Sequence, residues 1–532
     1  MEEKGVLALF AVILAALAVL FLRLGATPLL DPDEARFART SVEMVRSHDY
    51  VVPTFEGQPR LVKPPLLHWI QASLFRIAGP SEMLARLPAA AATLVSLLLV
   101  AWIGWRRFGV EGAAWATAIF LTFPIVVMIG RIGTLDALLS VHVLAVVALD
   151  LVQPDDGGLQ RSAVIGGLLG LAFLVKGPVG VALPLLIMLA GRTATGRELV
   201  PSLRSAITAL LGWAAVTLPW GLVFIQRIGG VRAAATLRSE VLDRYVEGTV
   251  HVQPWWFFGG VAALGFLPWI VPLVLGTIRG LLRWRDAESP TGPYAAAALV
   301  AGLVFFSLGK GKLANYILPL APLAALVVTF ELGQELVHPS RNRAGPQLLT
   351  ATLVALAIVL GAAGATRLEN RAEGLAYFGA AVYGLTAVVA LYGTVKNAPR
   401  ISYAAAAMGS IVFLIGVVCG IPPFLAETRS TAPLVTKVPA LLSVRPLVEV
   451  DINLPSLTYY ADRVPERLSG PQLPARLAQG DNPLVVISDS DWPALAPEVR
   501  AGLREIGRSG KLKVMERSDR QRNSDESKPP TP

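Results

Sequence analysis

The stretch LALFAVILAALAVLFL, residues Leu7–Leu22, is apolar at every position, and a similar run, LVALAIVLGAA, spans Leu353–Ala363. Neither run alternates with period two, as the strands of a membrane barrel do. The hydrocarbon core of a bilayer is about 30 Å thick and takes about 20 apolar residues of helix to cross. Because only helices and closed barrels satisfy their backbone groups in lipid, these runs predict transmembrane helices.

Stretches of this kind recur along most of the chain. The composition agrees, since 54% of the 532 residues are hydrophobic and 16% are charged, against roughly 25% charged residues in soluble domains. The predicted fold class is therefore an all-α polytopic membrane protein with about thirteen transmembrane helices within residues 1–422. The predicted spans lie near residues 6–24, 83–104, 111–130, 134–152, 162–176, 178–191, 205–225, 255–280, 292–308, 315–333, 348–366, 375–395 and 401–422.

Basic residues indicate the orientation of these spans. The net charge of +9 does not indicate nucleic acid, because the basic residues are spread between spans and are not clustered with aromatic residues. If the N-terminus is cytoplasmic, most short loops on the inner side are basic, as the positive-inside tendency requires. Thirteen spans then place the C-terminus outside. The inner basic residues are Arg106, Arg107, Arg192, Arg197, Arg204, Arg279, Arg283, Arg285, Arg341, Arg343, Lys396 and Arg400.

The loop 25–82, between the first two spans, is expected to be external and to contain two amphipathic helices. Asp31 suits the N-cap of the first helix and Pro32 its first position. Apolar residues then recur at helical spacing in each helix. We expect both helices to lie on the membrane and to shape an entrance between bilayer and water. The apolar positions are Ala35, Ala38, Val42 and Val45 in the first helix, and Leu66, Ile70, Leu74 and Ile77 in the second, which follows Lys63-Pro64-Pro65.

Two other external segments are basic, against the general charge bias. They are the loop 227–254 and the turn Gly309–Lys312. A basic segment on the outer side needs a reason, and an anionic ligand is one.

After Pro422 the composition changes to that of a small α/β domain over residues 423–518, predicted to be extracytoplasmic. Short β-like runs alternate there with helical stretches. The β-like runs are Leu447–Ile452, Leu484–Ser488 and Leu512–Met515, and the helical stretches lie near Ser456–Ala461 and Ala494–Leu503. The tail 519–532 is rich in polar residues and proline and is predicted to be disordered.

Several ionisable residues are candidates for chemistry. Asp33 and Glu34 lie in the external loop, and Asp136 lies at the outer end of the fourth span. Their alternative role is to stabilise the first turn of a helix. Lys63 and Lys176 are cations in apolar surroundings, which either extend to the interface or converge on a phosphate. Five scattered histidines do not indicate a zinc site.

The order of the motifs along the first 330 residues resembles that of the bacterial aminoarabinose transferases, in the protein-mannosyltransferase-like superfamily. No single motif decides this resemblance, which rests on seven of them in register. They are Asp31–Arg36, Leu61–Trp69, Glu82–Pro88, Gly130–Leu138, Leu171–Gly180, Gln253–Trp256 with Gly265–Trp269, and Lys312–Pro322.

The resemblance implies the membrane-embedded glycosyltransferase fold called GT-C, in a bacterial inner membrane with the C-terminal domain in the periplasm. It implies a sugar donor on undecaprenyl phosphate, a glycolipid acceptor such as lipid A, and no nucleic acid. Aminoarabinose is the best-known sugar of the family, and hexoses stay open. By the same resemblance the catalytic residues are Asp33, Glu34 and Asp136, and the donor-phosphate pocket contains Lys63, Lys176, Arg244, Tyr316 and Arg36.

The chain departs from the family pattern before the Lys-Pro-Pro motif, where Tyr and Glu are common and this chain has Arg60 and Val62. The acceptor, and any divalent cation bound through that Glu, are therefore left open. Asp33 would act as a general base toward a hydroxyl acceptor or orient a phosphate acceptor, in a single displacement with inversion. A transporter or lipid flippase and a noncatalytic scaffold are the alternatives.

Overall fold

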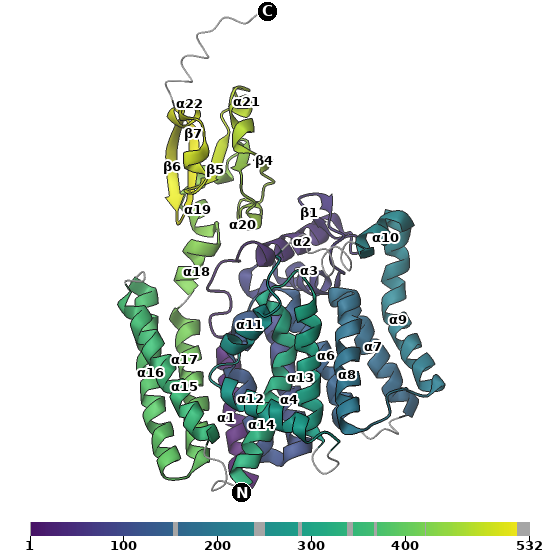
Figure 1. Cartoon of the computed structure of the whole chain (residues 1–532). Helices are drawn as coiled ribbons and strands as arrows, with labels where there is room; N and C mark the ends of the chain where they lie inside the picture. The colour runs from purple at the N-terminus through teal and green to yellow at the C-terminus, as the bar shows by residue number, and fades with distance from the viewer. Residues whose placement is uncertain are drawn as a thin grey trace, which may run out of the picture.

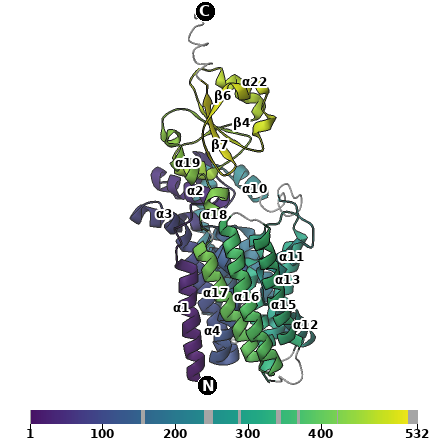
Figure 2. The ribbon, with the colours of Figure 1, turned by 90° about the vertical axis from the view of Figure 1, so that its left-hand side faces the viewer.

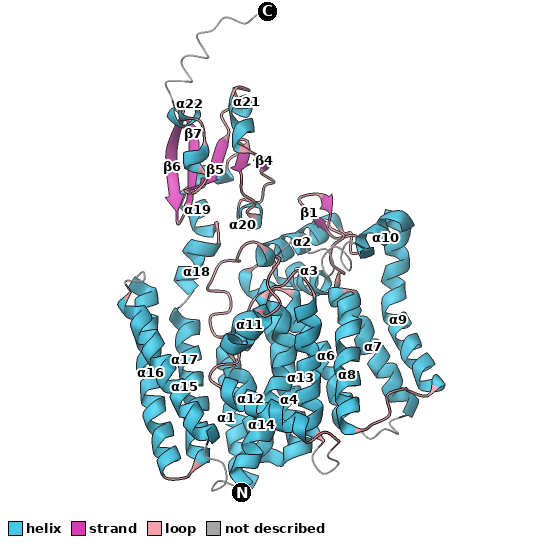
Figure 3. Cartoon of the chain, in the orientation of Figure 1, coloured by secondary structure: helices cyan, strands magenta, loops and turns pink. Residues whose placement is uncertain are grey.

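The computed structural model describes residues 2–152, 158–238, 251–285, 290–337, 344–366, 370–420 and 422–518. A bundle of long helices forms one end of the molecule, a layer of short helices covers one end of the bundle, and a small sheet domain lies beyond that layer (Figures 1 and 2). Strands within the described residues are confined to the hairpin β1–β2 (Thr54–Phe55 and Gln58–Pro59) and to the sheet domain (Figure 3).

The bundle consists of long apolar helices, as predicted, and the chain is a multi-pass membrane protein. Shorter elements connect them: α5 (Pro124–Gly130), α10 (Gly230–Arg238), α11 (Phe257–Gly265), α12 (Ile270–Leu282) and η2 (Ala314–Leu320). The long helices are α1 (Glu2–Phe21), α4 (Glu82–Thr122), α6 (Leu135–Val152), α7 (Gly158–Lys176), α8 (Pro178–Thr195), α9 (Leu203–Ile228), α13 (Thr291–Leu308), α14 (Ala321–Val337), α15 (Ala344–Ala365), α16 (Asn370–Val395) and α17 (Pro399–Gly420).

The described residues contain ten helices long and apolar enough to cross a membrane, or eleven if α11 and α12 form one span. These two helices meet at 117°, so the predicted span 255–280 is broken. The predicted spans 83–104 and 111–130 both lie largely in α4, which Gly109 divides into two helices at φ 73° and ψ −175°. Glycine adopts this conformation without steric cost. The count of thirteen spans stays a prediction.

The sheet domain has five strands in the order β4-β3-β5-β7-β6, with β3 parallel to β4 and β5, and β7 antiparallel to β5 and β6. The three predicted strands are confirmed as β3 (Leu447–Val450), β5 (Leu484–Ser488) and β7 (Leu512–Arg517), and the first predicted helix as α20 (Pro455–Tyr460).

Two edge strands of this sheet were not predicted, namely β4 (Glu466–Leu468) and β6 (Leu503–Ser509). The expected helix near Ala494–Leu503 is wrong in extent, because α22 covers Pro497–Ala501 and Leu503 begins β6. β6 lacks the alternation of buried and exposed residues by which a strand is recognised, because its buried residues lie at its two ends only. The predicted disordered tail 519–532 lies outside the described residues.

The layer over the bundle contains the two predicted helices of the first external loop, α2 (Asp33–Ser47) and α3 (Leu66–Ala78). The apolar side predicted for α3 is exposed at Ile77, as a face in contact with lipid would be. In contrast, α2 does not lie on the membrane as an open amphipathic helix. Nine of its residues are buried, because it packs between α3 and α20.

The predicted capping role of Asp31 is also wrong. Pro32 occupies the N-cap position of α2, and no side chain caps the helix. The Asp31 carboxylate accepts hydrogen bonds from the Ser456 backbone N–H at 2.7 Å and from the Ser456 hydroxyl. The sheet domain is thereby joined to the chain two residues before Asp33.

Candidate active site

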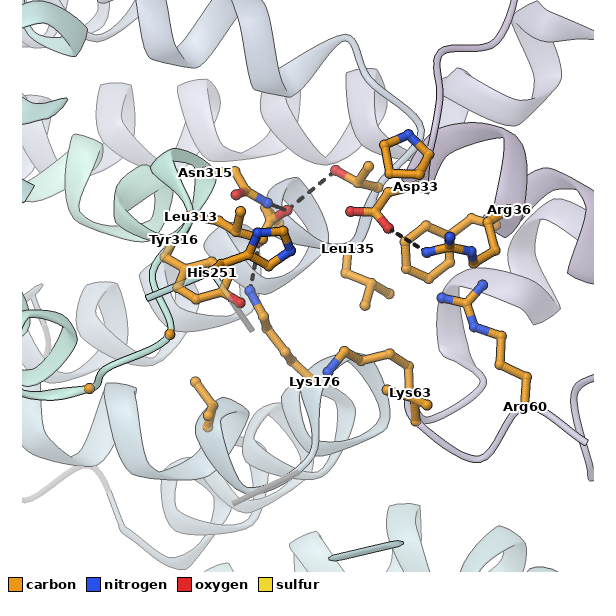
Figure 4. A pocket seen from close by; sticks show the side chains of 18 of the residues that line it. Asp33, Arg36, Arg60, Lys63, Leu135, Lys176, His251, Leu313, Asn315 and Tyr316 are labelled. Atoms are coloured by element: carbon orange, nitrogen blue, oxygen red, sulfur yellow. Dashed lines mark hydrogen bonds and ion pairs between the residues drawn. The ribbon is translucent and has the colours of Figure 1, made fainter. Parts of the chain in front are cut away.

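A cavity of 770 Å³ lies between the α2 layer and the adjoining ends of the bundle helices (Figure 4). Six of the eight predicted site residues line it, although they come from separate segments of the chain. They are Asp33, Arg36, Lys63, Asp136, Lys176 and Tyr316. Asp33 and Lys63 therefore face one space, as a shared site requires. Arg244, predicted to bind phosphate, lies outside the described residues.

Asp136 is the buried carboxylate of the cavity. It lies in the first turn of α6, where the helix dipole favours negative charge. Its Oδ1 accepts from Lys176 Nζ at 2.7 Å, and its Oδ2 accepts from Asn315 Nδ2 at 2.5 Å and from Thr134 Oγ1 at 3.3 Å. The side chain is 4% exposed. Three donors thus hold this carboxylate in one position (Figure 4).

Lys176 reaches Asp136 because the chain reverses directly after it. It is the last residue of α7, Gly177 follows at φ 61°, and Pro178 begins α8. A residue with a side chain is strained at that φ, so glycine suits the turn. Lys176 Nζ also lies 4.3 Å from the centre of the Tyr316 ring, within the range of a cation–π contact.

Asp33 is the accessible carboxylate of the cavity. It begins α2, and its side chain is 49% exposed. Arg36, one turn later, donates to its Oδ1 at 3.2 Å and lies 5.9 Å from the centre of the Phe55 ring. Since about half of the side chain is exposed, much of this carboxylate faces open space.

Glu34 was predicted to be a catalytic residue, but it does not line the cavity. Its side chain is 1% exposed and forms a two-point ion pair with Arg86, at 2.7 and 2.8 Å. It also accepts from the backbone N–H groups of Leu30 and Gly133, at 2.9 and 2.8 Å. Glu34 therefore ties the start of α2 to the turn before α6, and so links the segments that carry Asp33 and Asp136.

The cavity is also lined by Arg60, His251 and Asn315, which were not among the predicted site residues. Arg60 lies 4.7 Å from the centre of the Phe37 ring. His251 lies on a segment whose backbone pairs with the turn Gly309–Lys312, through Val252 and Gly311. The sequence contained indications of two of these residues. His251 lies in the loop 227–254, which, like the turn Gly309–Lys312, is basic on the predicted outer side, and Asn315 lies in the motif Lys312–Pro322.

The lining does not fit a divalent cation. Hard cations such as Mg²⁺ and Ca²⁺ need several oxygen ligands. The carboxylates among the described lining residues are Asp33 and Asp136, and each is already paired with a cation. No group of three His, Cys, Asp or Glu side chains suited to a metal occurs in the part of the chain that the structure describes.

Sequence comparisons relate this chain to known enzymes. Residues 62–220 match the family model described as dolichyl-phosphate-mannose-protein mannosyltransferase. An undecaprenyl phosphate-alpha-4-amino-4-deoxy-L-arabinose arabinosyl transferase of Aeromonas salmonicida is 32% identical over 60% of this chain and 58% of its own length. The Yersinia pestis protein of the same description is 29% identical over 75% of this chain and 74% of its own length.

The match to the Aeromonas salmonicida protein thus spans less than two thirds of that protein. The structural match covers a larger share of both chains than the sequence match does. The crystal structure of ArnT from Cupriavidus metallidurans bound to undecaprenyl phosphate superimposes with a TM-score of 0.75 over 98% of this chain and 99% of its own, at 21% identity. Its apo form gives 0.76 over 97% and 98%. The expected fold is confirmed over nearly the whole molecule.

Proposed function

We propose that this chain, which is similar to aminoarabinose transferases in sequence and has the fold of ArnT, transfers a sugar from undecaprenyl phosphate to a lipid A-type or other envelope glycolipid. The observation that most supports this proposal is the cavity, in which the half-exposed carboxylate of Asp33 shares one space with Arg36, Lys63 and Lys176. The similarity to named arabinosyl transferases supports the same reaction.

The cations of the cavity suit the leaving group. As the glycosidic bond breaks, undecaprenyl phosphate gains negative charge, and Lys and Arg stabilise phosphate oxygens. We assign this role to Lys63, Lys176 and Arg36, with the Tyr316 hydroxyl as a further donor. Groups fixed before the reaction cost no reorganisation when the charge develops, and one such donor typically contributes about 10²–10³ in rate.

Asp33 is the proposed catalytic carboxylate. Toward a hydroxyl acceptor it serves as a general base, which typically contributes about 10²–10⁴ in rate. Toward a phosphate acceptor, which is already anionic, it orients the acceptor or stabilises positive charge at the anomeric carbon. Either path is a single displacement with inversion, and retention of the anomeric configuration would exclude both.

Asp136 and Glu34 have supporting roles in this proposal. Asp136 lines the cavity and orients Lys176 and Asn315, since its oxygens already accept from both. Glu34, predicted as catalytic, acts through Arg86 and Gly133 as a positioning residue for Asp33.

We further propose that the protein lies in a bacterial inner membrane with its N-terminus cytoplasmic, because that orientation leaves most short inner loops basic. The cavity and residues 423–518 are then periplasmic. In this arrangement residues 1–422 form the transmembrane glycosyltransferase domain, with external loops 25–82 and 227–254.

A transporter or flippase is not favoured. Such proteins usually carry their ionisable site near the bilayer midplane between repeated halves. Here the cavity is lined in part by Phe55, Gln58 and Pro59 of the hairpin in the loop 25–82, which suits chemistry at the membrane surface.

The test is sugar transfer by purified protein in liposomes containing a radiolabelled undecaprenyl-phosphate sugar and an extract of outer-membrane glycolipids. Asp33→Asn should lower the rate by at least about 10². The matched control is Asp481→Asn, because Asp481 is similarly exposed at 41% and also pairs with an arginine. Equal rates of sugar transfer by Asp33→Asn and Asp481→Asn would refute the proposed mechanism.

A further inference from the structure

The hairpin β1–β2 forms part of the wall of the cavity. Phe55, Gln58 and Pro59 line the cavity. Arg36, which pairs with Asp33, lies 5.9 Å from the centre of the Phe55 ring. Each strand of the hairpin has two residues, and an isolated two-stranded hairpin is marginally stable at best in water. Its place beside the catalytic carboxylate therefore depends on contacts with other elements.

The turn of the hairpin contains a residue that does not suit its backbone. Glu56 and Gly57 join the two strands, at φ 57° and 72°. Positive φ at both central residues is typical of a type I′ turn, in which Asn-Gly and Asp-Gly are preferred. A residue other than glycine is uncommon at positive φ, and asparagine and aspartate tolerate it better than glutamate. Local preference does not explain Glu56, so its side-chain contacts supply the reason.

The sheet domain binds the Glu56 carboxylate. Arg467 of β4 donates to the two carboxylate oxygens at 2.5 and 2.7 Å, and the Thr458 hydroxyl donates to one of them at 2.8 Å. The Glu56 side chain is 8% exposed. Arg467 is itself fixed, because its Nε donates at 2.9 Å to Glu449, whose side chain is 0% exposed. Two-point contacts between arginine and carboxylate restrict geometry as well as adding energy.

The same turn is bound by α2. Glu43 accepts from the backbone N–H groups of Glu56 and Gly57, at 2.9 and 3.2 Å, and from the Thr54 hydroxyl at 2.9 Å. The turn thus has one anchor on the helix that begins with Asp33 and a second on the sheet domain.

Resting on the proposed function, we propose that Glu56 and Arg467 are positioning residues for sugar transfer. Through this ion pair the sheet domain holds the hairpin wall of the cavity next to Arg36 and Asp33. Neither Glu56 nor Arg467 lines the cavity, so both act through the hairpin.

Separate contacts attach the sheet domain to α2. Asp462 pairs with Arg39 at 2.5 Å and with Arg46 at 2.6 Å. Loss of the pair between Glu56 and Arg467 should therefore displace the hairpin and leave the domain attached.

The variant Glu56→Asn separates the ion pair from the turn. It gives the turn the preferred sequence Asn-Gly, but asparagine is shorter and uncharged, so the two-point contact with Arg467 is lost. In the liposome transfer assay kcat should fall by at least about tenfold, because a misplacement of about 1 Å near a reaction can cost about 10² in rate. Limited proteolysis should release the sheet domain at the rate of the parent protein.

The matched control is Glu516→Asn. Glu516 lies in β7 of the same domain, is 13% exposed, and accepts from Arg445 at 2.9 Å and from Arg504 at 2.6 Å. This variant loses a carboxylate of similar burial that also binds arginine, and it should keep the kcat of the parent protein.

A second variant tests whether Arg467 acts through Glu56. Arg467→Lys keeps a positive charge beside Glu449, but one ammonium group cannot replace a guanidinium that binds two carboxylates. Its kcat should fall, and the double variant Glu56→Asn/Arg467→Lys should be no slower than Glu56→Asn alone, because both changes remove the same contact.

Three results would overturn the inference while the proposed function stands. They are a Glu56→Asn protein with the kcat of the parent, an equal loss in Glu516→Asn, and a double variant in which the two losses multiply. A loss of kcat accompanied by faster release of the sheet domain also overturns it, because attachment of the domain then explains the loss. If the parent protein transfers no sugar, the proposed function fails, and the inference with it.

Discussion

Replacement of Arg86 by Gln tests the buried ion pair that we propose positions the catalytic carboxylate. Arg86 and Glu34 are 5% and 1% exposed. The guanidinium also donates to three backbone carbonyls of the segment that leads to α2, those of Leu24, Thr27 and Pro28, at 2.9, 2.5 and 2.9 Å. The substitution removes the positive charge and most of these hydrogen bonds.

Breaking a buried ion pair costs about 3–5 kcal/mol, because one charge is left without its partner. An unsatisfied buried acceptor adds about 1–3 kcal/mol, part of which the Gln amide restores. We therefore expect Arg86→Gln to lower the free energy of unfolding by about 4 kcal/mol. Because Glu34 also binds Gly133, Asp33 and Asp136 lose their common support, and kcat should fall by about 10².

The assays are thermal unfolding of the detergent-purified protein and transfer kinetics in liposomes. The control is Arg400→Gln, since Arg400 and Glu111 form an ion pair that is 58% and 45% exposed and such pairs contribute about 0–1 kcal/mol. The double variant Glu34→Gln/Arg86→Gln should be more stable than Arg86→Gln alone, because no buried charge remains unpaired. If Arg86→Gln melts with the parent protein and keeps its kcat, the positioning role is refuted.

Three further predictions concern the same layer and the cavity. Burial raises the pKa of Asp31 from 3.8 to about 6, so the folded protein binds this proton more tightly, and the resulting stability is full below about pH 4 and lost as the pH rises through 6. Asp31→Asn should therefore melt higher than the parent protein at pH 7.5, by the equivalent of about 3 kcal/mol, and together with it at pH 4. Asp462 pairs with two arginines of α2, so Asp462→Asn should weaken the attachment of the sheet domain by about 1–2 kcal/mol, seen as faster release of that domain in limited proteolysis, and an unchanged rate of cleavage would contradict this. Asn315→Leu removes a donor from Asp136 and should lower kcat by about tenfold or more in the transfer assay, with unaltered kcat as the opposing result.

The membrane part was predictable because its cause is local. A bilayer requires long apolar helices whatever their neighbours are, so the run Leu7–Leu22 lies in α1 except for its last residue, and the run Leu353–Ala363 lies in α15. The break between α11 and α12 was not predictable from hydropathy, since both halves are apolar and the bend depends on packing.

The site was predictable only as a set of residue types. Asp33 and Glu34 are adjacent and both carry a carboxylate, yet Asp33 lines the cavity and Glu34 pairs with Arg86, 52 residues further along the chain. Asp31 has the sequence of an N-cap, but its partner Ser456 is 425 residues away. Local propensity cannot detect partners at such separations, because Arg86 and Ser456 meet the start of α2 only when α4 and the sheet domain pack against it.

The most direct measurement of the central claim is a cryo-EM map of the protein with undecaprenyl phosphate, joined to binding measurements on Lys63→Gln. We predict that the phosphate lies within hydrogen-bonding distance of Lys63, with the Asp33 carboxylate facing it across the same cavity, and that Lys63→Gln weakens binding by at least about tenfold. A phosphate bound elsewhere in the molecule, together with unchanged binding by Lys63→Gln, would contradict it.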